Sequence, residues 1–156
     1  MNAKLLTSTL MGAAAIMATS LTAPVLAAGP TIIELTQTPC QFVEVETKDH
    51  GFKSTKKADC EAINARTETK RLKEAKVLRL KAGEHIFRVT NKNVPYNLGF
   101  YLRGAGLIGR VTLPKVSGGG LSTGVTKEYA INLKPGEYNY SCPLNTTPDY
   151  KIIVEG

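Results

Sequence analysis

Five side chains of this sequence belong to the types that bind soft metals or act as nucleophiles. They are three cysteines and two histidines: Cys40, Cys60, Cys142, His50 and His85. A nucleophilic cysteine needs a base within hydrogen-bond reach to form the thiolate, and the sequence places neither histidine beside a cysteine. The carboxylates are scattered, and no cysteine has the spacing of a zinc or haem site. We therefore expect a protein that is not an enzyme.

Residues 1–27 have the pattern of a secretory signal peptide. Lys4 supplies the positive start, Leu5–Leu21 contains the apolar stretch, and Val25–Ala27 precedes the expected cut. The remaining residues, 28–156, are predicted to form one domain in the periplasm or outside the cell. An uncleaved anchor is the alternative, which the short apolar stretch disfavours. No later stretch of ~20 apolar residues follows, so stable membrane insertion after cleavage is not expected.

Export places the cysteines in an oxidising compartment, where three cysteines leave one over after a single pairing. Cys40 and Cys60, twenty residues apart, are the predicted disulfide, because that bridge would tie a helix to a strand. Cys142 is then the unpaired thiol, directly before Pro143. Three roles stay open for it: a buried inert thiol, a metal ligand, and an oxidative link to another chain.

The secondary-structure pattern predicts an all-β domain with one helix. A run without glycine or proline indicates a helix over Asp59–Ala75, whose thin apolar stripe places it on the surface. Strands separated by turn residues suggest an antiparallel sandwich or barrel. The predicted strands are Thr31–Thr36, Gln41–Glu46, Val77–Leu80, Ile86–Thr90, Leu98–Leu102, Leu107–Leu113, Glu128–Leu133, Tyr138–Cys142 and Lys151–Val154. The glycine-rich segment Val116–Gly124 is the expected mobile loop, and Tyr138 and Tyr140 share a strand face that favours the core.

About half of the chain carries a resemblance to a known family. The segment Leu133–Pro143, a strand that ends in cysteine, is followed by a loop and the final strand, and resembles the C-terminal hairpin of cupredoxins. The segments Lys81–Lys92 and Gly99–Leu102 are similar to the third and fourth strands of that family. The resemblance implies a cupredoxin-like Greek-key β-sandwich, with the helix as an N-terminal addition.

The resemblance also implies copper binding or electron transfer, with Cys142 as the one family ligand retained. A cupredoxin copper site uses a histidine that opens the fourth strand, then a cysteine, a second histidine and usually a methionine from the last loop. In this sequence those three other places fall near Tyr96 and Asn97, on Asn145 and on Tyr150, so the standard site is absent. His85 is expected at the far end of its strand, whereas the sequence does not place His50.

The alternative function is a metal-free binding or structural module. Between Lys53 and Lys81 the chain has ten Lys or Arg and four Asp or Glu, which makes one local positive patch on the predicted helix and its flanks. Such a patch could dock an acidic partner protein or touch an anionic membrane surface, with Lys70, Arg71 and Lys73 as the docking residues. Nucleic acid is excluded as a partner, because the patch lacks interleaved aromatic residues.

Overall fold

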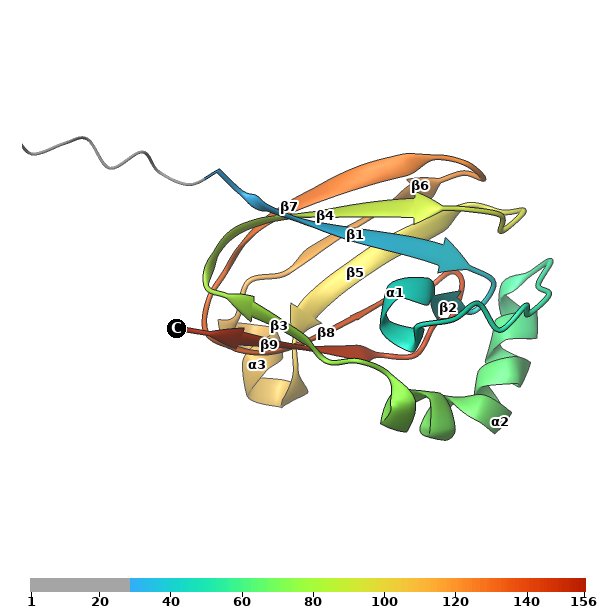
Figure 1. The fold of residues 1–156 in the computed structure, drawn as a ribbon, viewed down its shortest axis with the longest axis horizontal. Coiled ribbons are helices and arrows are strands. Elements are labelled where there is room, and N and C mark those ends of the chain that lie inside the picture. Colours follow the sequence, from blue (N-terminus) through green and yellow to red (C-terminus); the bar gives the residue numbers. More distant parts are fainter. Residues whose placement is uncertain (1–28) are drawn as a thin grey trace, which may run out of the picture.

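The computed structural model describes residues 29–156; the predicted signal peptide, 1–27, lies outside the described residues. The elements, in chain order, are β1 (Thr31–Thr38), β2 (Gln41–Phe42), α1 (Val43–Glu46), α2 (Lys57–Glu74), β3 (Leu78–Lys81), β4 (Gly83–Asn91), β5 (Leu98–Gly104), α3 (Gly106–Thr112), β6 (Val116–Leu121), β7 (Thr126–Leu133), β8 (Gly136–Ser141) and β9 (Tyr150–Glu155) (Figure 1). Within residues 29–156 no helix is long and apolar enough to cross a membrane.

The strands form two sheets packed face to face. One has the order β2-β1-β4-β7 and the other β3-β9-β8-β5-β6. Most neighbours are antiparallel, but β1 pairs parallel with β4, and β3 with β9. The predicted sandwich is therefore confirmed, but two strand pairs are parallel where the sequence suggested an antiparallel arrangement. Both parallel pairs arise because chain crossovers, rather than hairpins, deliver β4 beside β1 and β9 beside β3.

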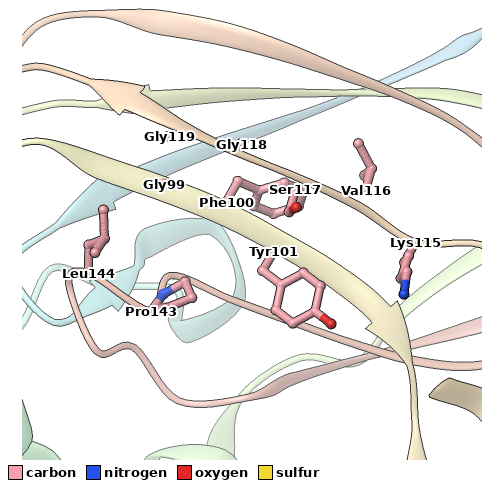
Figure 2. Close-up of a pocket in the computed structure, with 10 residues that line it drawn as sticks. All are labelled: Gly99, Phe100, Tyr101, Lys115, Val116, Ser117, Gly118, Gly119, Pro143 and Leu144. Atoms are coloured by element: carbon pink, nitrogen blue, oxygen red, sulfur yellow. The ribbon is translucent and has the colours of Figure 1, made fainter.

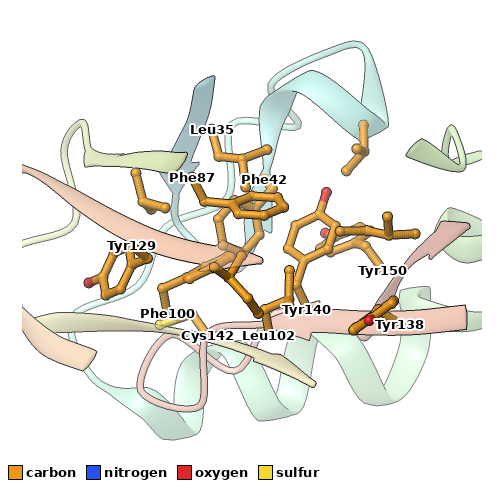
Figure 3. Close-up of a cluster of buried hydrophobic side chains, with 14 of the residues drawn as sticks. Leu35, Phe42, Phe87, Phe100, Leu102, Tyr129, Tyr138, Tyr140, Cys142 and Tyr150 are labelled. Carbon is orange, nitrogen blue, oxygen red and sulfur yellow. The ribbon is translucent and has the colours of Figure 1, made fainter. Parts of the chain in front are cut away.

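The core between the sheets is rich in aromatic side chains, as Figure 3 shows. Successive side chains of a strand point to opposite faces of the sheet, and β4 accordingly buries every second residue from His85 to Asn91. Tyr138 and Tyr140 are fully buried, which confirms their predicted core role. Phe42 packs edge-to-face on Tyr140 at 5.2 Å and on Tyr150 at 5.9 Å, a geometry that aromatic pairs prefer.

The helix predicted over Asp59–Ala75 is confirmed as α2, and the Cys40–Cys60 disulfide fixes it to the end of β1. Figure 1 shows α2 beyond one end of the sandwich, which we call the disulfide pole. The chain reaches the bridge through a left-handed turn, since Cys40 has a φ of 65°. The sequence thus adds a rigid helix to one end of the sheets without contributing much to the core between them.

Three predicted local structures are wrong. The strand predicted over Gln41–Glu46 is instead the two-residue β2 followed by α1, a helical turn that carries the Glu46 carboxylate inward. The strand predicted over Leu107–Leu113 is α3. The glycine-rich segment Val116–Gly124, predicted as a loop, forms β6 over its first six residues and pairs with β5. Tertiary contacts decided each case against local propensity.

Gly118 shows why glycine serves a strand here. A Cβ at this position would lie 2.8 Å from the Cε1 of Tyr129, so only glycine lets β6 approach the core side chain of the opposite sheet. The glycine run is therefore a packing device at the edge of the five-stranded sheet.

Candidate functional site

The Cys142 thiol lies at the disulfide pole, directly after the last residue of β8. Its Sγ is fully buried and accepts hydrogen bonds from the backbone N–H of Gly99 at 3.4 Å and of Asn145 at 3.2 Å. Burial raises the pKa of the Cys142 thiol, and the backbone donors offset only part of that rise. The sulfur is thus a protonated thiol at neutral pH, buried at the edge of the hydrophobic core.

Asn145, at the predicted place of the second histidine, lies beside Cys142 but its side chain is already engaged. Its Oδ1 accepts from the backbone N–H of Cys40 at 3.0 Å, and its Nδ2 donates to the Thr38 carbonyl at 2.9 Å. The same Oδ1 lies 3.3 Å from the Cys60 Sγ. The amide therefore joins the last loop to the disulfide, and it is fully buried.

Tyr150, at the predicted methionine place, belongs to a buried ionic cluster. Its hydroxyl donates to Glu46 Oε1, and the Arg71 guanidinium donates to both carboxylate oxygens of Glu46, at 2.6 and 2.8 Å. Burial, and then the negative Glu46 carboxylate, raise the pKa of Tyr150 well above its ordinary value. A phenol held in this way stays protonated and faces a carboxylate.

The residue that opens β5 is Leu98, which is fully buried and apolar. The predicted substitute, Asn97, is exposed on the preceding turn, where its Oδ1 accepts from the Ser122 hydroxyl at 2.7 Å. β5 begins at Leu98, as predicted, but the Asn97 side chain is exposed and bonded to Ser122, so the structure does not bring Asn97 beside Cys142. Tyr96, the neighbouring residue at the first histidine place, has its hydroxyl 2.6 Å from Ser54 Oγ and 3.4 Å from Asn145 Oδ1, so this place offers a hydrogen-bonded phenol in place of an imidazole.

The two histidines belong to other contacts. His85 lies near the start of β4, with its Nδ1 3.0 Å from the Gly83 carbonyl oxygen, which confirms it as an ordinary strand residue. His50 Nε2 lies 2.7 Å from Glu46 Oε2, and its ring stacks on Phe52 at 5.1 Å. Across residues 29–156, no group of three or more His, Cys, Asp or Glu side chains is arranged to hold a metal ion.

A cavity of about 670 Å³ lies on the outer face of β5 and β6, next to the loop that follows Cys142. Figure 2 shows Tyr101 on β5 and the pair Pro143 and Leu144 on the loop at its edges. Cys142 is not among the lining residues, and its side chain is fully buried. This cavity therefore gives no access to the thiol.

Solved structures share this arrangement of strands. Auracyanin B is 13% identical, and the match covers 85% of this chain and 94% of that chain with a TM-score of 0.50. The chain has a cupredoxin-like fold. Two amicyanin variants, one oxidised and one in a reduced Cu(I) form, are 15% identical over 83% of this chain and 86% of theirs, with TM-scores of 0.39 and 0.36. No protein-family model and no curated protein sequence matches the chain.

The structure brings Asn145 beside Cys142, but the residues at the predicted ligand places do not fit copper. Tyr96, Asn145 and Tyr150 have their polar atoms hydrogen-bonded within the protein, and Asn97 is exposed away from the thiol. A copper centre of this kind needs imidazole nitrogens beside the thiolate. The predicted ligand places supply no imidazole, so we assign no step to copper.

The predicted docking residues separate into two groups. Lys70 and Lys73 are exposed on α2, whereas Arg71 is 4% exposed and bound to Glu46. The prediction that Arg71 is a docking residue is wrong, because the turn of the helix directs it inward between two exposed lysines. Glu46 and Leu98 were missed altogether. The only sequence signal for Glu46 was a carboxylate in an otherwise alternating apolar segment.

Proposed function

We propose that the protein is an exported, metal-free cupredoxin-like module without catalytic activity, which docks an acidic partner protein through the exposed face of α2. We place it in the periplasm or outside the cell on the basis of the predicted signal peptide. The observation that carries the proposal is the excess of exposed cations over α2 and its flanks, where seven exposed Lys and Arg face the four carboxylates of the helix. We call the exposed cations of α2 and its flanks the basic face: Lys53, Lys56, Lys57, Arg66, Lys70, Lys73 and Lys76.

Few of these charges are neutralised locally. Lys57 pairs with Glu61 at 3.2 Å and Lys70 with Glu74 at 3.9 Å, both as exposed i,i+4 pairs. Exposed pairs of this kind contribute little to stability and exchange readily for other partners. The basic face therefore carries an excess of positive charge that an acidic surface can complement.

A small groove beside the basic face supports this role. It has a volume of about 260 Å³ and is lined by Lys48, His50, Phe52, Arg66, Thr67, Lys70, Arg71 and Glu74. The Arg71 guanidinium lies 5.0 Å from the Phe52 ring centroid and so closes the floor of the groove. Lys48, Arg66 and Lys70 leave three cationic groups at its margin, which suits a carboxylate side chain of a partner.

The basic face is also held rigidly. The disulfide fixes the first turn of α2, and Arg71 fixes its last turn by donating to the Cys40 carbonyl at 2.8 Å and to Glu46. A surface that is ordered before binding loses less entropy when a partner docks. These contacts hold α2 to the sandwich although the helix buries few apolar side chains.

Charge reversal tests the docking proposal. We expect Lys70→Glu with Lys73→Glu to weaken binding of poly-L-glutamate, a defined acidic probe, by about tenfold at 0.15 M salt. Isothermal titration calorimetry at 0.05 and 0.5 M salt measures this, because screening should remove most of the wild-type affinity. The matched control, Lys92→Glu with Lys134→Glu, makes the same change of net charge away from α2. Equal weakening by both pairs, or binding that ignores salt, would contradict a local docking face.

Copper binding with electron transfer is the other candidate, since the fold is that of copper proteins and Cys142 is retained. The donor set disfavours it. Wild type and Cys142→Ser are purified after export and loaded with Cu(I) under reducing conditions or with Cu(II) under oxidising ones. Native mass spectrometry should then show the same background of bound copper in both proteins. Stoichiometric copper in wild type that Cys142→Ser loses would replace the metal-free proposal by a Cys142-centred site.

A further inference from the structure

The helix α3 carries three aliphatic side chains that the fold leaves in solvent. Leu107 is 85% exposed, Ile108 80% and Val111 85%. Other exposed aliphatic residues, such as Ile32 at 46%, are far better covered. Single exposed apolar residues are ordinary, but three on one turn form a patch that marks a contact with an apolar medium.

The backbone explains why α3 turns these side chains outward. A Cβ on Gly104 would lie 2.1 Å from the Gly109 carbonyl oxygen, so the helix packs on β5 through glycine backbone alone. Leu113, just after the helix, supplies the apolar contact with the sheet by lying against Gly136. Positions 107, 108 and 111 fall on the opposite side of the helix, within about 100° of arc. We call these three side chains the α3 wedge.

Positive charges surround the α3 wedge. Arg110 lies on the helix itself, Lys115 follows it, and Lys134 lies on the adjoining turn between β7 and β8; all three are exposed. The neighbouring β8 carries an acidic residue, Glu137, whose backbone carbonyl accepts from the Ala105 N–H and whose carboxylate pairs with Lys151 at 3.2 Å. An apolar helix face flanked by cations is typical of elements that lie in the surface of an anionic membrane.

α3 lies apart from the basic face. Figure 1 shows it at the end of the sandwich opposite the disulfide pole, the same end at which β1 begins and β9 ends. The α3 wedge and the basic face are therefore separate surfaces of the domain.

We propose that the α3 wedge inserts shallowly into the surface of an anionic lipid bilayer. A second copy of this chain is disfavoured as the occupant on grounds of area. Three aliphatic side chains expose about 300 Å², whereas a stable protein interface takes about 800 Å² from each partner. A bilayer needs no complementary protein surface, and the flanking Arg110, Lys115 and Lys134 add attraction to its headgroups.

The test uses the chain purified after export, so that the cell sets its N-terminus. We expect it to sediment with vesicles of phosphatidylcholine and phosphatidylglycerol at a ratio of 70:30. The variant Leu107→Gln, Ile108→Gln, Val111→Gln should bind about 100-fold more weakly, since it loses all three aliphatic contacts. Binding should also fall on vesicles of phosphatidylcholine alone. Because the replaced side chains are exposed and glutamine favours helix, thermal unfolding should be unchanged.

The matched control is Ile32→Gln with Val77→Gln, which removes exposed aliphatic side chains elsewhere and should leave vesicle binding intact. Equal binding by wild type and the α3 variant, or no binding by either, would overturn the proposal. Sedimentation velocity gives the remaining outcome: a concentration-dependent dimer that the α3 variant loses, without vesicle binding, would reassign the α3 wedge to self-association.

Discussion

Replacing Arg71 by methionine is expected to lower the free energy of unfolding by about 3–5 kcal/mol. The guanidinium donates to both oxygens of Glu46, to the Cys40 carbonyl and, at 2.7 Å, to Asn64 Oδ1. With Arg71 gone, a carboxylate that is 2% exposed keeps its burial but loses its main counter-charge. Urea unfolding followed by circular dichroism measures the loss.

The pH dependence of stability tests the role of Arg71 more sharply than the size of the stability loss does. In the wild type, burial acts to raise the pKa of Glu46, but hydrogen bonds from Arg71 and Tyr150, and the charges of Arg71 and His50, hold it below its ordinary 4.5. This contribution to stability is present above pH 4.5 and is lost as the pH falls through the lowered pKa. In Arg71→Met, burial should raise the pKa of Glu46 instead. The variant should then recover stability as the pH falls, while the wild type loses it.

Two further variants serve as controls for the Arg71→Met measurement. Lys70→Met changes the neighbouring exposed residue of the same helix and should shift stability by less than about 0.5 kcal/mol. Glu46→Gln combined with Arg71→Met removes both charges and should restore part of the lost stability, because the buried carboxylate is no longer charged. A single Arg71→Met variant as stable as wild type, with unchanged acid dependence, would show that the cluster does not hold α2.

The parts of the fold that the sequence predicts well are those in which one pattern dominates. The alternation along β4 and β7, the long run of α2 and the unequal settings of the cysteines each agree with the structure. The strand prediction for Leu107–Leu113 was wrong because a short apolar run fits a strand and a helix equally well. Its helical state depends on the contact between Gly104 and Gly109, which no local pattern reveals.

The candidate site shows a different limit. Loop spacing correctly placed Asn145 next to Cys142, since both lie on one short connection between β8 and β9. The inward direction of Arg71 could not be read from a run of cations, because its partner, Glu46, is 25 residues earlier and sits on a turn predicted as strand. Which polar atoms are already hydrogen-bonded decides whether they can bind metal, and that information exists only in three dimensions.

Removing the Cys40–Cys60 disulfide is expected to lower the free energy of unfolding by about 3 kcal/mol, the value for a closed loop of this length. The bridge joins residues twenty apart, and it lies against the Asn145 side chain. We expect the loss to be uneven. Asn145 connects the disulfide to the Cys142 loop, so this pole should open before the sandwich of aromatic side chains does.

Cys142 reports that opening directly. In the wild type its buried thiol, with its raised pKa, should react slowly with Ellman's reagent, because labelling requires the loop to open. Without the disulfide, labelling should accelerate by up to about 100-fold if most of the lost stability is local to this pole. Labelling should then be faster than global unfolding measured by tyrosine fluorescence.

The residue that replaces Cys40 decides whether the measured loss of stability comes from the missing cross-link or from backbone strain. Cys40 has a φ of 65°, where alanine is strained and glycine is not, so Cys40→Gly with Cys60→Ala removes the bridge alone. Cys40→Ala with Cys60→Ala should be about 1 kcal/mol less stable than the glycine form. If the glycine form matches wild type in both urea midpoint and Cys142 labelling, then the disulfide holds neither α2 nor the loop. In that case the rigid mounting of the basic face must rest on Arg71 and Glu46.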